Sequence, residues 1–189
     1  ATGSVALVGI EDIILRAEDM VFELNRGTDP RAVTGAQIPV IDYTASAAAA
    51  PAAFGSAAGL KVLTGEGDDD FEILDMAGEL LRIAGFAVIQ ISAFVHVSGA
   101  FSIVQGGSQT VKLRGGGEKS VTSLLVGGSG INIFVGADGP YFEADETAPG
   151  GFAAPNDPGD AIGLALENVS FGLALFSAAA PTDNSSYYA

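Results

Sequence analysis

An acidic, glycine-rich segment contains the residue types best suited to binding a metal ion. Residues 65–71 match the G-x-G-x-D-x-apolar half of the calcium-binding nonapeptide repeat. Glycines allow the backbone to turn, and carboxylates supply the hard oxygen ligands of calcium, which takes about six to eight of them. A single copy cannot build a calcium roll, and the same residues suit a solvated hairpin tip. Calcium binding by Asp68, Asp69 and Asp70 is therefore one of two open interpretations.

Two further acidic loops carry candidate ligands. The segment from Asp145 to Asp160 is rich in proline and glycine, lacks a strand or helix pattern, and is expected to be a surface loop. Its Asp145, Asp157 and Asp160, together with Asp183 near the other end of the chain, are suitable calcium ligands. We expect calcium, if bound, at one of these three loops.

Residues typical of catalysis are sparse. His96 is the only histidine and the chain has no cysteine, which excludes a two-histidine zinc site, thiol catalysis and disulfides. No nucleophile elbow, Walker loop or dinucleotide fingerprint occurs. The carboxylates Glu72, Asp75 and Glu79 leave glycoside cleavage open as an alternative. We predict that the protein is not an enzyme and that His96 is structural.

Charge and composition narrow the class of partner. The chain has 8 basic and 23 acidic residues and a net charge of -15, which repels nucleic acid and anionic membranes. No apolar run is long enough for a membrane-spanning helix. The absence of cysteine and tryptophan and the low pI of about 4.1 are typical of secreted bacterial surface proteins. An extracellular location is the expectation.

A strict alternation between residues 81 and 103 is the strongest structural signal. Every odd-numbered residue there is apolar or glycine, whereas the even positions mix polar and apolar types. A period of two places successive side chains on opposite faces of a strand. Because one strand of this length is improbable, we predict two or three strands that bend at Gly85 and Gly99. The odd-numbered face is expected to supply the core.

The rest of the chain repeats this strand pattern. The parity of the apolar positions changes near Glu18-Asp19, which indicates a turn or β-bulge. We predict an edge strand at 38–43, a loop with one helical turn at 45–59, and tight connections at 115–117 and 127–130. Further strands are predicted at 5–8, 13–17, 20–24, 60–63, 71–74, 110–113, 121–126, 131–135, 141–144, 162–166, 169–176 and 187–188.

These elements predict one all-β domain over residues 1–189, with a loop insert at 145–160. Its strands are expected to be mostly antiparallel and arranged in a sandwich or flattened barrel, with a β-solenoid as the alternative.

The two ends of the chain support a resemblance to a known family. Tyr188-Ala189 at one end, and the passage from Gly3 to Ile10, which reads GSVALVGI, at the other, resemble the junction between modules of giant tandem-repeat bacterial exoproteins. These are the RTX-associated surface proteins and adhesins. Four internal pieces support the resemblance: Ile38-Pro39-Val40, Ala84-Gly85-Phe86, residues 97–102 and residues 131–136. The inserts at 45–54 and 146–160 are longer than the family pattern.

The resemblance implies that this chain is about one repeat unit, acting as a spacer or adhesive segment of a surface fibre. Its partners would be neighbouring copies or modules of the same protein. Two alternatives remain open from the residues: an outer-membrane β-barrel, and a carbohydrate-binding or carbohydrate-active β-sandwich that contacts a surface glycan through the 145–160 loop.

Overall fold

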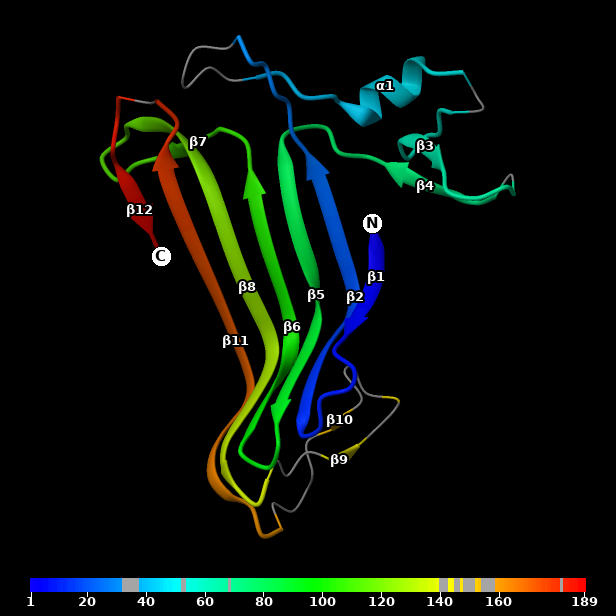
Figure 1. The fold of residues 1–189 in the computed structure, drawn as a ribbon. Coiled ribbons are helices and arrows are strands. Elements are labelled where there is room, and N and C mark those ends of the chain that lie inside the picture. Colours follow the sequence, from blue (N-terminus) through cyan, green and yellow to red (C-terminus); the bar gives the residue numbers. More distant parts are fainter. Residues whose placement is uncertain are drawn as a thin grey trace.

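One long antiparallel sheet dominates the computed structural model, which describes residues 1–31, 38–51, 54–67, 69–139, 143–144, 147, 152–153, 159–180 and 182–189. Its strand order is β1-β2-β5-β6-β8-β11-β12, with β7 also paired to β8. Figure 1 shows the long strands side by side in a curved sheet. The strands are β1 (Thr2–Ala6), β2 (Ile13–Asn25), β5 (Leu80–Ile91), β6 (Val95–Gly106), β7 (Gln109–Lys112), β8 (Glu118–Ala137), β11 (Ile162–Ala178) and β12 (Ser186–Tyr188).

The predicted fold class, all-β with mostly antiparallel strands, is confirmed. Every strand pair of the main sheet is antiparallel. The sheet does not close on itself, since β1 and β12 form its two edges.

The alternating segment forms the β5–β6 hairpin at the centre of the sheet. Its registers place Ile83 opposite Ile103 and Ile89 opposite Val97, so the odd-numbered residues share one face as predicted. The segment forms two strands, within the predicted two or three, but the chain reverses at residues 92–94 and not at Gly85 or Gly99. Gly99 lies instead at an irregularity of the β6–β8 ladder.

Both glycines lie within strands, where the neighbouring strand leaves no room for a side chain. A Cβ on Gly85 would lie 2.6 Å from Met20 Sδ, and one on Gly99 would lie 2.8 Å from Ile131 Cα.

β-Bulges let several predicted strands join into longer ones. Residues 13–17 and 20–24 both belong to β2, and the expected irregularity is a bulge in which Asp19 has a φ of 50°. In the same way 162–166 and 169–176 are one strand, β11, interrupted by a bulge at Asn168, whose φ is also 50°. Aspartate and asparagine tolerate this left-handed conformation better than most residues. The pattern change in the sequence thus marks a bulge in each case.

The glycine-rich stretch at 127–130 is not a turn, contrary to the prediction. It lies inside β8, between the segments predicted as two strands. The ring of Phe171 on β11 lies over Gly128, where a Cβ would overlap it. An aromatic ring from a neighbouring strand thus fills the space above this strand glycine.

The predicted turn at 115–117 is confirmed. Leu113 N donates to Gly117 O at 2.7 Å, and Gly115 and Gly116 have φ values of +104° and +93°.

A small subdomain, formed by the segment between β2 and β5, lies at one end of the sheet (Figure 1). It contains helix α1 (Tyr43–Ala49) and the predicted hairpin of β3 (Leu60–Leu63) and β4 (Phe71–Leu74). The prediction of a strand at 38–43 is wrong, because Asp42 accepts from Ala45 N at 2.8 Å and caps the helix instead. The helix ends just before Pro51.

The buried core is small. Among the described residues only four apolar ones are buried: Ala47, Val88, Val121 and Phe134. The odd-numbered face, expected to be the core, stays largely exposed because no described element covers it: Ile89 and Ile91 keep 40% and 45% of their surface. A third, two-stranded sheet pairs β9 (Glu143–Ala144) with β10 (Phe152–Ala153); the remainder of the predicted 141–144 strand lies outside the described residues.

Candidate functional site

The acidic loops do not come together in the described part of the chain. Asp70 Oδ2 accepts from Gly67 N at 3.1 Å and so helps to close the β3–β4 turn, while Asp69 and Asp160 are exposed. Asp68, Asp145 and Asp157 lie outside the described residues. Within the described ranges, no group of three or more acidic or histidine side chains could hold a metal ion. Calcium binding stays a prediction.

Asp183 is instead held by an ion pair. Its carboxylate lies 2.7 Å from Lys119 Nζ and also accepts hydrogen bonds from the backbone N and the hydroxyl of Ser185. The hydrogen bond from Lys119, followed by those from Ser185, holds the pKa of Asp183 well below its usual range. The same contact raises the pKa of Lys119. Lys119 also lies 5.7 Å from the ring centre of Tyr187, so this cluster fastens β12 to β8.

His96 is fully buried within the sheet. Its Nε2 lies 3.1 Å from the Ser98 hydroxyl and its Nδ1 3.5 Å from Gln90 Oε1. Desolvation by burial lowers the pKa of His96 to about 4, which keeps the ring neutral at pH 7. Two of its neighbours are a hydroxyl and an amide, and a structural role for His96 stays a prediction.

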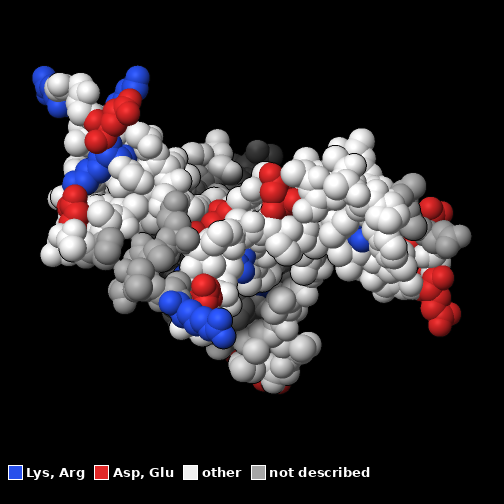
Figure 2. All heavy atoms as spheres, turned by 90° about the horizontal axis from the view of Figure 1, so that it is seen from above, with Lys and Arg blue, Asp and Glu red and all other residues white. Residues whose placement is uncertain are grey.

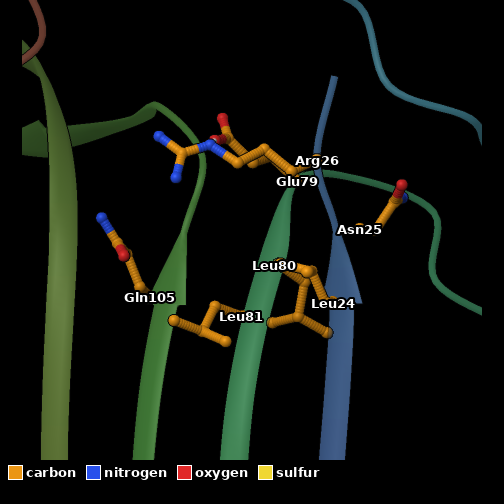
Figure 3. Close-up of a pocket in the computed structure, with 7 residues that line it drawn as sticks. All are labelled: Leu24, Asn25, Arg26, Glu79, Leu80, Leu81 and Gln105. Carbon is orange, nitrogen blue, oxygen red and sulfur yellow. The ribbon is translucent and has the colours of Figure 1, made fainter. Parts of the chain in front are cut away.

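The three carboxylates considered for glycoside cleavage line two different hollows. Glu72 and Asp75 line one beside β2, whereas Glu79 lies 3.8 Å from Arg26 in another. Figure 3 shows this second pocket, with Arg26 reaching past Glu79 toward Gln105. Its volume of about 30 Å³ is enough for only a water molecule or so. The structure therefore does not unite these carboxylates, and most of the 145–160 loop lies outside the described residues.

One side of the main sheet is lined mainly by apolar residues and is here called the apolar face. Directly opposed residues of antiparallel strands share a face, so the registers define rows that cross β2, β5, β6, β8 and β11. Four such rows, taken together, contain a single polar residue, Gln105. They are Ile13-Ile91-Val95-Val135-Leu164, Leu15-Ile89-Val97-Ile133-Leu166, Phe22-Ile83-Ile103-Val126-Leu173 and Leu24-Leu81-Gln105-Leu124-Leu175.

The opposite side, here called the mixed face, carries the charged side chains of Arg16, Glu18, Glu23 and Arg82. Two ion pairs lie there, Arg16 with Glu18 at 3.0 Å and Arg82 with Glu23 at 3.2 Å. Buried His96 and Phe134 are cross-strand partners on this face as well. Figure 2, which views the molecule from above, shows the charged residues in small separate groups with uncharged surface between them. The sheet is thus strongly asymmetric.

At each edge of the sheet, backbone hydrogen bonds show which residues turn their N–H and C=O toward the neighbouring strand. At one edge, Ala189 exchanges both backbone hydrogen bonds with Ala174 of β11, at 2.9 and 3.0 Å. At the other edge, Ala1 exchanges both with Phe22 of β2, each at 2.8 Å. Among the described residues, β12 covers β11 only near its end, so the outer edge of β11 from Ile162 to Leu173 has no strand beside it.

Comparisons with protein-family models, with curated proteins and with solved structures found no match to this chain. In the described part of the molecule, no helix is both long and apolar enough to cross a membrane. The function is therefore inferred from the surfaces described above.

Proposed function

We propose that this chain is a structural or adhesive repeat module of an extracellular bacterial surface protein or fibre, whose copies join end to end through the edges of their sheets. The proposal is carried by which residues at the two edges turn their backbone N–H and C=O groups outward, away from the sheet. An uncovered strand edge presents a row of free N–H and C=O groups that another strand can pair with.

The outer edge of β11 is suited to receive a strand in line with β12. β11 is regular from Val169 to Ala178, because the extra residue in that part of the β8–β11 ladder lies on β8. Backbone groups in a strand point alternately to its two sides. Since Ala174 faces outward to Ala189, Gly172 and Ser170 face outward too.

β1 presents the complementary edge. Ala1 and Leu7 both hydrogen-bond to β2, and the extra residue in the β1–β2 ladder lies on β2. By the same alternation, Thr2 and Ser4 face away from β2. If β1 of a second copy follows β12 along β11, its Thr2 meets Gly172 and its Ser4 meets Ser170.

The sides to which the residues at this junction turn their backbone groups agree with one continuous strand. In such a strand, Ala189 would face β11 of its own copy, and Ala1 of the next copy would face β2 of that copy. Adjacent residues must face opposite sides, and these two do. One strand would then join two modules into a single uninterrupted sheet.

Negative-stain electron microscopy of the purified module tests the proposal. We expect filaments from the unaltered chain, and their loss in Ser4→Pro, which removes an outward N–H without removing a bond to β2. The preceding residue is Gly3, which tolerates the restriction that proline imposes. Ser4→Thr keeps the N–H and is the matched control. Compact monomers from the unaltered chain, or filaments of unchanged length from Ser4→Pro, would contradict edge pairing.

Stabilisation by calcium is a second part of the proposal, supported by the oxygen-rich loops that contain Asp69, Asp70 and Asp160. Millimolar calcium should raise the melting temperature of the module above its value in chelator, because a ligand bound to the folded state stabilises it. An unchanged melting temperature removes calcium and leaves edge pairing untouched.

A further inference from the structure

The molecule, whose main sheet is a single layer, exposes much more surface than a compact chain of its size. The accessible surface is 12423 Å². A compact monomer of 19.0 kDa is expected to expose about 8,400 Å², so the excess is about 4,000 Å². Soluble monomers rarely expose contiguous apolar patches above a few hundred Å², and larger ones mark interaction sites. Something is expected to cover this face.

The size of the face matches the interface of a stable dimer. Its five long strands span about 24 Å at ~4.8 Å per strand, and a strand of 12 residues such as β5 is about 40 Å long. The product is about 1,000 Å² per copy, or about 2,000 Å² for two copies. Obligate homodimers bury roughly 2,000 Å² or more and have apolar interfaces.

The placement of the charged residues allows a second copy to occupy this face. Each chain carries a net charge of -15, so two copies repel each other wherever their charged surfaces meet. The four rows of the apolar face contain no charged residue, whereas Arg16, Glu23 and Arg82 lie on the mixed face. Two copies that meet through their apolar faces therefore keep their charges on the outside of the pair.

We propose that the apolar face packs against the same face of a second copy, so that two chains form a two-layer β-sandwich. The pair is symmetric, since the same surface serves both partners. Sheets packed in this way lie about 10 Å apart with interdigitating side chains. This contact uses a face of the sheet, whereas the end-to-end junction uses its edges, and either can form without the other.

Two lysine substitutions test the proposal, made in the Ser4→Pro background so that edge pairing is blocked. Ile89→Lys places a charge in the apolar face, on β5, which has a strand on both sides. Leu125→Lys is the matched control, because Leu125 lies on the mixed face, opposite Val104 and Ala174, and has the same 40% exposure as Ile89. Both variants change the net charge equally. Sedimentation and light scattering measure the mass, and circular dichroism checks the fold.

We expect the mass of two chains for Ser4→Pro and for its Leu125→Lys derivative. Ile89→Lys should dissociate, with an affinity weakened roughly 100-fold or more, because an unpaired charge would be buried in the interface. Monomers in all three proteins, or dimers that persist in Ile89→Lys, would overturn the proposal. Monomers that bind phosphatidylcholine vesicles through this face would also overturn it and assign a lipid surface instead. Filaments from Ser4→Pro would contradict edge pairing but not the face-to-face pair. In that case the proposed pair requires that Ile89→Lys halves the mass per length of the filaments.

Discussion

A chain of two modules in tandem allows the junction between sheets to be tested by a single inserted residue. In the direct fusion, Ala189 of the first copy is followed by Ala1 of the second. One glycine inserted between them reverses which backbone groups face β11, because the period of a strand is two. Two inserted glycines restore the parity and are the control for added length.

The expected size of the effect follows from the backbone bonds at stake. Gly172 and Ser170 of the first copy would each exchange two hydrogen bonds with the second copy. At ~1 kcal/mol net for each bond, the four bonds stabilise the junction by about 4 kcal/mol. Hydrogen exchange at the amides of Gly172 and Ser170 should then slow by up to about 1,000-fold compared with the single Ser4→Pro module, in which edge pairing is blocked.

The result that refutes this reasoning is equally definite. Amide protection at Gly172 and Ser170 should disappear with one inserted glycine and largely return with two. Equal protection in all three fusions, or none in the direct fusion, would show that β1 does not extend the line of β12.

Two further predictions concern pH. Because burial lowers the pKa of His96 from 6.5 to about 4, the folded state resists protonation, and about 3 kcal/mol of stability should be lost as the pH falls from above 6.5 toward 4. Urea unfolding at pH 7.5 and pH 4.5 measures this loss, and a His96→Gln variant that shows the same pH dependence would contradict it. The depressed pKa of Asp183 stabilises the folded state above its ordinary value of 3.8, and this contribution is lost as the pH falls below that value. Asp183→Asn should therefore lower the melting temperature more at pH 7 than near pH 2; an equal decrease at both pH values would count against the ion pair with Lys119.

The sequence predicts side-chain faces better than it predicts chain reversals. Apolar alternation correctly places the odd-numbered residues of the β5–β6 hairpin, such as Ile83, Ile89 and Val97, on one face, because strand geometry follows the period of two. Glycine, in contrast, has two meanings. At Gly115 it forms a turn, whereas at Gly128 it makes room for the ring of Phe171. Only the identity of the neighbouring strand separates these cases, and a single sequence does not contain it.

The candidate interaction surface shows the same limit. The pattern identifies an apolar face and expects it to be the core, since apolar faces of single domains usually are. Whether a second layer comes from the same chain depends on where the connections place the remaining elements. Here the long excursion between β2 and β5 forms α1, β3 and β4 at the end of the sheet (Figure 1). The sequence also does not show which residues of the edge strands face outward, because this depends on which strand each end of the chain pairs with.

The excursion between β2 and β5 leaves and rejoins the sheet at the same place, since Asn25 and Leu80 are register partners. The buried Asn25 amide donates to Ile41 O and Gly78 O, both at 2.8 Å, and so links the two ends of the excursion. A segment with adjacent ends can be exchanged for another without moving the strands that flank it. A foreign domain grafted between Asn25 and Leu80 must therefore supply acceptors for the Asn25 amide, and an assembled fibre would display it at a regular spacing.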